Sequence, residues 1–114
     1  MMINPAKLDL SIRRGADFSI SFDILIDGTI LDLSGATVKS QIRRSFSRTA
    51  SLIADFTVTI NAETNEITLS LTDTETATLP VVDAAYDVLV SIGEEDAYYL
   101  EGAVRIGDSV TIEA

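Results

Sequence analysis

The fold is decided by residues 56–72, which read FTVTINAETNEITLSLT. On either side of a polar stretch, residues 61–65, apolar residues alternate with Thr and Ser. Successive side chains of a β-strand point to opposite faces, so strict alternation indicates a strand with one apolar and one polar face. We therefore predict an antiparallel hairpin whose strands cover residues 56–60 and 67–71.

The same alternation continues toward the N-terminus. It predicts one strand from Phe18 to Ile26, a turn at Asp27-Gly28 and a short strand over residues 29–33. Further along, Ser47 to Ser51 is polar and indicates a loop. Between these segments lies a strand on which Val38, Ser40 and Ile42 share one face.

Toward the C-terminus the pattern predicts a second hairpin, with strands over residues 86–92 and 98–106 around a turn at 93–96. Alternation turns Tyr98 inward and Tyr99 outward, and the glycine at 102 predicts a β-bulge. A last short strand is expected to contain Val110 and Ile112.

One helical turn interrupts the strands. Thr72-Asp73-Thr74-Glu75 fits a capping box, and Pro80 ends the turn. Seven to nine strands at 8–12-residue spacing, without a helix long enough for parallel crossovers, predict an all-β fold. We expect an immunoglobulin-like antiparallel two-sheet β-sandwich with one short helical turn near residues 73–79. Residues 1–7 are predicted to form an N-terminal arm and residues 8–114 a single domain.

Composition limits the chemistry. The 114 residues include no Cys and no His, so the chain has no disulfide, no thiolate metal site and no histidine base. Neither a converging pair of acids nor a phosphate-binding glycine loop is evident. We predict that the protein is not an enzyme and has no catalytic, cofactor-binding or metal-binding residues. Calcium binding at Glu94-Glu95-Asp96 stays open, although the spacing matches no known calcium loop.

Charge is distributed unevenly along the chain. Residues 1–50 hold seven cations and five acids, a net charge of +2, whereas residues 51–114 hold one cation and thirteen acids, a net charge of −12. The total of −10 argues against nucleic-acid binding. Neither a signal peptide nor an apolar run long enough to span a membrane is present. We expect a protein made in the cytoplasm, without membrane insertion.

Half of the eight cations lie within ten residues, 39–48. On a strand Lys39, Gln41 and Arg43 would share one face, and Arg44 would point to the other. The pattern is typical of an edge strand protected by charge, and equally of a strip that docks an acidic partner. The candidate interface residues are Lys39, Gln41, Arg43, Arg44, Arg48, Arg13 and Arg14.

An ordered set of segments resembles a family of short phage and prophage tail proteins and, more distantly, the N-terminal immunoglobulin-like domain of phage baseplate upper proteins. The segments are Asp32-Leu33-Ser34-Gly35-Ala36-Thr37-Val38, Ser40-Gln41-Ile42-Arg43, Phe56 to Ile60, Ile67 to Thr72, Ala77 to Pro80, Tyr86-Asp87-Val88 and Tyr99-Leu100-Glu101-Gly102. The resemblance implies a virion protein of the baseplate or tail-fibre junction. It would assemble in multiple copies with other tail, baseplate or fibre proteins, and it carries over no catalytic residues.

The chain departs from these families in two ways, and this narrows the role that is expected of it in the tail. Baseplate upper proteins continue into long segments that hold receptor-binding proteins, and relatives carry a glycine before the strand that starts near Tyr86, where this chain has residues 81–85 without one. An adaptor subunit is therefore expected. The alternatives are a free-standing carbohydrate- or protein-binding β-sandwich module and a neck or capsid decoration protein. With Tyr99 as the one aromatic predicted to face outward, a carbohydrate-binding module is the weaker prediction.

Overall fold

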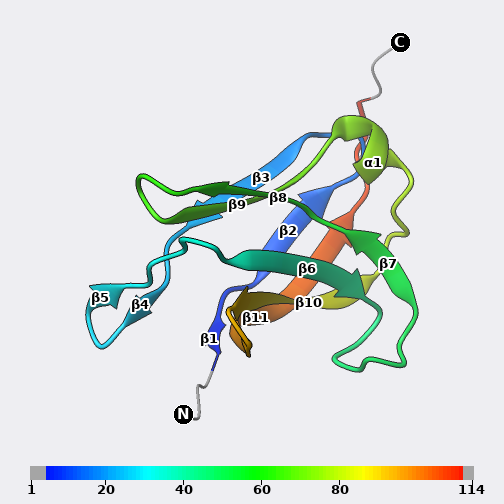
Figure 1. Cartoon of the computed structure of the whole chain (residues 1–114). Coiled ribbons are helices and arrows are strands. Elements are labelled where there is room, and N and C mark those ends of the chain that lie inside the picture. Colours follow the sequence, from blue (N-terminus) through cyan, green and yellow to red (C-terminus); the bar gives the residue numbers. More distant parts are fainter. Residues whose placement is uncertain (1–4, 112–114) are drawn as a thin grey trace.

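Two β-sheets face each other in the computed structural model, which describes residues 5–111 (Figure 1). In the larger sheet β11 pairs with β10, β10 with β6, and β6 with β7, while β1 and β2 both lie along the other edge of β11. The smaller sheet has the order β3-β9-β8. The bounds of the larger sheet are β1 Ala6–Lys7, β2 Leu10–Arg13, β6 Thr37–Arg43, β7 Leu52–Asp55, β10 Asp83–Ile92 and β11 Glu95–Gly107, and those of the smaller sheet are β3 Phe18–Phe22, β8 Thr57–Asn61 and β9 Glu66–Leu71.

The predicted all-β sandwich is confirmed. The sheets correspond to the B-E-D and G-F-C-C′ sheets of immunoglobulin-type domains. The prediction of a purely antiparallel fold is wrong in one respect, because β1 and β2 run parallel to β11. Alternation does not encode strand direction, and the whole domain separates β2 from β11, which leaves ample chain for a parallel crossover. Ala6–Lys7, in the stretch predicted as an arm, thus extend the large sheet.

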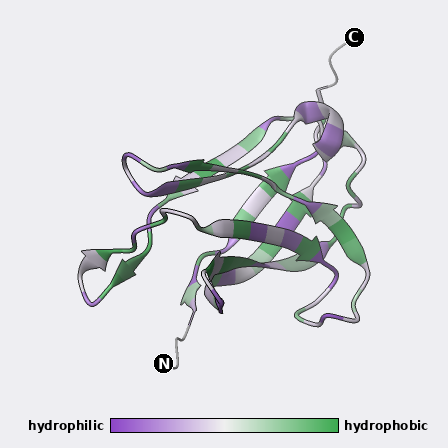
Figure 2. Ribbon diagram, in the orientation of Figure 1, coloured by the Kyte–Doolittle hydropathy of each residue, from purple (hydrophilic) through white to green (hydrophobic). Residues whose placement is uncertain are grey.

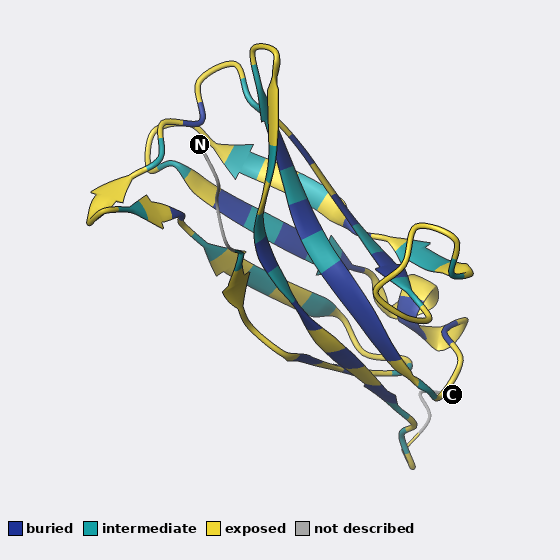
Figure 3. Cartoon of the chain, turned by 90° about the horizontal axis from the view of Figure 1, so that it is seen from below, coloured by how far each residue is buried: buried dark blue, intermediate teal, exposed yellow. Residues whose placement is uncertain are grey.

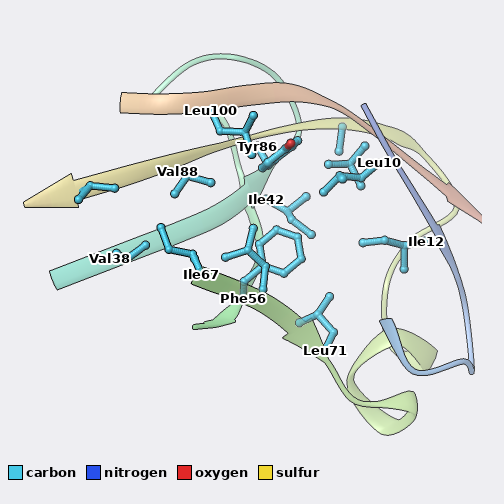
Figure 4. Packing of buried hydrophobic residues seen from close by; sticks show 14 of the residues in the cluster. Leu10, Ile12, Val38, Ile42, Phe56, Ile67, Leu71, Tyr86, Val88 and Leu100 are labelled. Carbon is cyan, nitrogen blue, oxygen red and sulfur yellow. The ribbon is translucent and has the colours of Figure 1, made fainter. Parts of the chain in front are cut away.

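The core lies between the inner faces of the two sheets (Figure 4). Alternate residues of β6, β10 and β11 point inward, and so do those of β9, which confirms the alternation of both predicted hairpins. Phe56 joins β7 to β8 where the chain crosses from one sheet to the other. Its ring centroid lies 5.9 Å from that of Phe18 and 6.2 Å from that of Tyr86. Apolar burial on both sheets therefore fixes their stacking.

The predicted helical turn is α1 (Asp73–Ala77), and both hydrogen bonds of the capping box form. The Glu75 N–H donates to Thr72 Oγ1 at 3.2 Å, and the Thr72 N–H donates to Glu75 Oε1 at 2.9 Å. The hydroxyl of Thr76, fully buried, accepts from the Gly15 N–H and donates to the Ala16 carbonyl. This hydroxyl ties α1 to the loop after β2. Among the described residues no helix is long and apolar enough to cross a membrane.

The first strand is interrupted where it passes Gly102. The Leu8 carbonyl lies so close to this glycine that a Cβ there would be 2.1 Å from the Leu8 oxygen. The Tyr86 hydroxyl donates to the same oxygen at 2.6 Å, and the Ala103 N–H donates to Asp9 Oδ1 at 2.9 Å. The bulge predicted at Gly102 is wrong, because pairing with β10 is continuous there. The glycine instead makes room for another backbone segment.

The bulge lies three residues earlier. Val88 pairs with Leu100 but Leu89 pairs with Tyr98, so Tyr99 is the extra residue of β11. The predicted orientations of the two tyrosines are therefore wrong. Tyr98 pairs with Leu89 on the outer face and is exposed, whereas Tyr99 packs against the core.

Two further predictions fail. The strand expected from Phe18 to Ile26 breaks after Phe22, where pairing with β9 ends, and the chain continues as a separate hairpin of β4 (Leu25–Ile26) and β5 (Thr29–Ile30). Asp27-Gly28 turns this hairpin as predicted, with φ of 51° and 81°. Val110 lies in no strand and is exposed, because the last paired residue of β11 is Gly107. Ile112, its predicted companion, lies outside the described residues.

Candidate functional site

The outer face of the large sheet carries three of the seven candidate residues, all on β6. On β6, Val38, Ser40 and Ile42 are buried, so Lys39, Gln41 and Arg43 project from the opposite face as predicted. Ser40 tolerates burial because its hydroxyl donates to the Asp87 carbonyl at 2.6 Å. The apolar alternation of β6 thus determines which way the charged side chains point.

A row of polar side chains crosses five strands of this face at one level. Register places Asp55 opposite Gln41, Gln41 opposite Asp87, Asp87 opposite Glu101, and Glu101 opposite Lys7. At one end the Gln41 amide donates to Asp55 at 2.8 Å, and at the other the Lys7 ammonium lies 3.9 Å from Glu101. Two carboxylates, Asp87 and Glu101, therefore lie side by side at the centre of the row.

The loop between β6 and β7 folds back onto the sheet beside this row. Arg43 Nη1 donates to the Ala50 carbonyl at 2.8 Å, and Nη2 donates to Gln41 Oε1 at 3.0 Å. The Arg44 N–H donates to the Ser51 carbonyl across the base of the loop. Arg44 itself lies just beyond β6 and is exposed, so it is not on the inner face of a strand as predicted. Arg43 thus holds the loop in place and belongs to the floor of the site.

Loop and sheet together enclose an open hollow of about 420 Å³. This is within the roughly 300–1,000 Å³ range of ligand-binding clefts. Two exposed aromatic side chains lie at it, Phe46 from the loop and Tyr98 from β11. The charged residues that line it are Arg43, Arg48, Asp87 and Glu101.

Two electrostatic features mark the hollow: the pKa of Asp87 is shifted, and nearby cations have no carboxylate partner within residues 5–111. Burial raises the pKa of Asp87 above its ordinary value of 3.8, and the neighbouring charge of Glu101 raises this pKa further, while Arg43 and Arg48 lower it. Over residues 5–111, moreover, none of the cations between positions 39 and 48 forms an ion pair with a carboxylate. We call Lys39, Arg43, Arg44 and Arg48 the basic strip. In a chain of net charge −10, the exposed Lys39, Arg44 and Arg48 remain available to another molecule, whereas the guanidinium of Arg43 is engaged with the loop and Gln41.

Arg13 and Arg14 do not join the strip. They follow one another at the end of β2, which is separated from β6 by β11 and β10. Arg13 donates to the Asp108 carbonyl, and Arg14 donates to the Ala77 carbonyl and pairs with the Asp108 carboxylate at 3.4 Å. Both therefore brace the junction of β2, β11 and α1.

Sequence reasoning did not single out four residues of the hollow. Phe46 carried a usable signal, since it is an aromatic residue inside a loop rich in Ser and Arg. Asp87 and Glu101 lie on the polar side of their strands, but their proximity depends on the register of β10 and β11. Tyr98 could not be found by alternation, because the bulge at Tyr99 reverses its orientation.

In the described part of the chain, no three acidic residues lie close enough together to hold a metal ion, those of the β10–β11 turn included. Comparison with known proteins adds no assignment. The chain matches no protein-family model, and no curated protein is significantly similar to it.

Proposed function

We propose that this chain is a non-enzymatic structural subunit of a phage tail, an adaptor at the baseplate or tail-fibre junction that docks through its basic strip. Its location would be the virion, after synthesis in the host cytoplasm. The carrying observation is the strip itself, four cations that pair with no carboxylate of the described chain. Arginine forks pair with carboxylates at two points, so the matching partner surface is acidic.

The ordered segments that resemble short phage tail proteins support the same proposal. Of these, Ser40-Gln41-Ile42-Arg43 lies in β6, which bears Lys39 and Arg43 of the strip. Tyr86-Asp87-Val88 lies in β10, which pairs with β6, and Tyr99 to Gly102 lies in β11, the next strand of the sheet. The resemblance therefore includes the face on which the candidate residues gather.

Charge reversal of the two strip cations in the β6–β7 loop tests the proposal. We expect the double variant Arg44→Glu/Arg48→Glu to fold normally, because neither side chain makes a hydrogen bond or ion pair within residues 5–111. Its incorporation into phage particles, measured by quantitative immunoblotting of purified virions, should fall at least about tenfold, which corresponds to about 1.4 kcal/mol of docking free energy.

The matched control is Arg105→Glu/Thr57→Glu/Thr59→Glu, which makes the same change in net charge away from the hollow. All three side chains are exposed and the ion pair of Arg105 with Asp83 is long, so little stability depends on them. This control should enter particles at the normal level. Normal incorporation of the strip variant would refute docking through the strip.

The exposed aromatics at the hollow favour a second candidate, a carbohydrate-binding module. Phe46 and Tyr98 could stack on a sugar ring, and Asp87 and Glu101 could accept hydrogen bonds from its hydroxyls. A glycan array separates the two functions. Specific glycan binding that is lost in Tyr98→Ala would support the module, whereas an array without binding leaves the adaptor as the proposal.

A further inference from the structure

The β4–β5 hairpin stands out from the rest of the sandwich. Its base is anchored, since Ile24 and Leu33 are buried and the Leu31 N–H donates to the Ile24 carbonyl at 2.8 Å. Beyond that base the two strands pair only with each other and project away from both sheets (Figures 1 and 3). Ile26 and Leu31 still pack against the core, so the apolar surface that the hairpin leaves uncovered belongs to Leu25 and Ile30.

Behind the Asp27-Gly28 turn, the facing pair Leu25 and Ile30 is apolar where a solvent-exposed hairpin would be polar. Leu25 is 61% exposed and Ile30 is 44% exposed. In Figure 2, β4 is hydrophobic in colour and the turn beside it is hydrophilic. Exposed apolar side chains gathered on one projection mark a binding surface more often than a solvated turn.

All charged residues of the hairpin are acidic. Asp23, Asp27 and Asp32 surround it, and residues 15–38 contain no Lys or Arg. In the described chain none of the three forms an ion pair. Hydrogen bonding from Ser34 lowers the pKa of Asp32, which keeps this carboxylate ionised.

The basic strip and the apolar surface around the hollow complement the hairpin. The lining of the hollow holds two cations and two carboxylates, so the attraction for acidic side chains comes from the exposed Lys39, Arg44 and Arg48 of the strip. Phe46, Leu52 and Tyr98 add exposed apolar surface around it. β6 begins on the side of the hairpin and ends at the β6–β7 loop, so the hairpin and the part of the strip in this loop lie at opposite ends of the strand (Figure 1). A strand of the large sheet separates them, and one chain cannot dock its own hairpin in its own hollow.

We propose that the β4–β5 hairpin of one copy docks in the hollow of a second copy, with its aspartates against the basic strip. This inference rests on the proposed function and names the partner of the same site. The contact joins two different surfaces, so repetition produces a head-to-tail ring or filament rather than a closed two-fold dimer. An assembly of this kind suits a subunit that is present in multiple copies.

A single contact of this size is weak. A ten-residue hairpin buries less than the roughly 800 Å² per partner of a standard interface. Self-association should therefore appear at high protein concentration and low ionic strength, and salt should weaken it, because exposed charge pairs are screened.

Two complementary variants test the proposal in the full chain. The hairpin variant Leu25→Ser/Ile30→Ser keeps the strip, and the strip variant Arg44→Glu/Arg48→Glu keeps the hairpin. By analytical ultracentrifugation, wild type should form a concentration-dependent series of oligomers, and each variant alone should remain monomeric. An equimolar mixture should form a one-to-one dimer and nothing larger, because only one intact hairpin and one intact hollow remain in each pair.

A matched control removes comparable apolar surface elsewhere. Val81 and Val110 are 53% and 98% exposed and lie away from both surfaces, so Val81→Ser/Val110→Ser should associate like wild type. The proposal is overturned if wild type stays monomeric at about 1 mM, near the weak end of measurable affinity. It is equally overturned if the hairpin variant associates like wild type or if the mixture forms no dimer.

The incorporation experiment distinguishes failure of the self-docking proposal from failure of docking through the strip. If the hairpin variant enters phage particles normally and the strip variant does not, the strip binds another tail component and only the self-docking is wrong. If both variants enter normally, docking through the strip is wrong as well.

Discussion

The Leu8 carbonyl shows how one backbone oxygen links three strands. Tyr86 from β10 donates to it, and Gly102 of β11 leaves space for it. Burial and the charge of Asp9 raise the pKa of Tyr86, so its hydroxyl keeps the proton that it donates. The glycine is therefore required for close approach of the chain and not for a bulge.

Substitution of Gly102 tests this requirement. In Gly102→Ala the new Cβ would overlap the Leu8 oxygen, so the first strand must move away and lose the Tyr86 hydrogen bond. Overpacking of this kind lowers the free energy of unfolding by about 1–3 kcal/mol. Urea denaturation measures the loss. Gly107→Ala is the control, because no atom lies within 4 Å of its Cβ position, and a similar loss there would contradict the explanation.

Asp87 makes the stability of the folded chain depend on pH. Its pKa is raised in the folded state, so its contribution to stability is complete at low pH and is lost as the pH rises through the raised value. Asp87→Asn should therefore be more stable than wild type at neutral pH and equal to it near about pH 3, below the ordinary pKa of an aspartate. Thermal denaturation at both pH values measures the difference.

The control for Asp87 is Asp96→Asn at the exposed start of β11, which removes one carboxylate that does not line the hollow. It measures the effect of net charge alone. A stabilisation of Asp87→Asn that persists at low pH would show that the cause is not the ionised carboxylate.

At the scale of elements, the structures that depend on residues close together in the sequence could be predicted from the sequence. The capping box at Thr72 and Glu75 predicted α1, and alternation predicted both long hairpins. The break after Phe22 and the bulge at Tyr99 escaped prediction, because each depends on a neighbouring strand. Phe22 is the last residue of β3 with a partner on β9, and nothing in the local pattern marks where that partner ends.

The attachment of α1 is predicted to depend on one hydroxyl. Thr76→Val keeps the shape of the buried side chain but leaves the part-buried Gly15 N–H and Ala16 carbonyl without their partner. Unsatisfied groups cost about 1–3 kcal/mol when fully buried, so we expect a loss of about 1 kcal/mol here. Thr74→Val, at an exposed position of the same helix, should change stability by less than about 0.5 kcal/mol in the same urea titration. Equal effects of the two variants would contradict the role of the Thr76 hydroxyl.

At the scale of the whole molecule, the candidate site was predictable only in part. Lys39, Gln41 and Arg43 follow from the alternation of one strand, and the structure places them together. Arg13 and Arg14 were grouped with them by charge alone, but two strands intervene. Strand order across a sheet is a long-range property, so neither this separation nor the approach of Asp87 to Glu101 can be obtained from local sequence.

The parallel pairing of β2 with β11 also constrains how the chain can fold while it is being synthesised. Asp9 and its hydrogen-bond partner Ala103 are 94 residues apart. A ribosome adds about 5–20 residues per second, so the first strand emerges roughly 5–20 s before its partner exists. During that time Leu10 and Ile12, which end up in the core, have no β11 to pack beside. The large sheet is therefore completed last, and β1 and β2 stay unpaired until β11 has been synthesised.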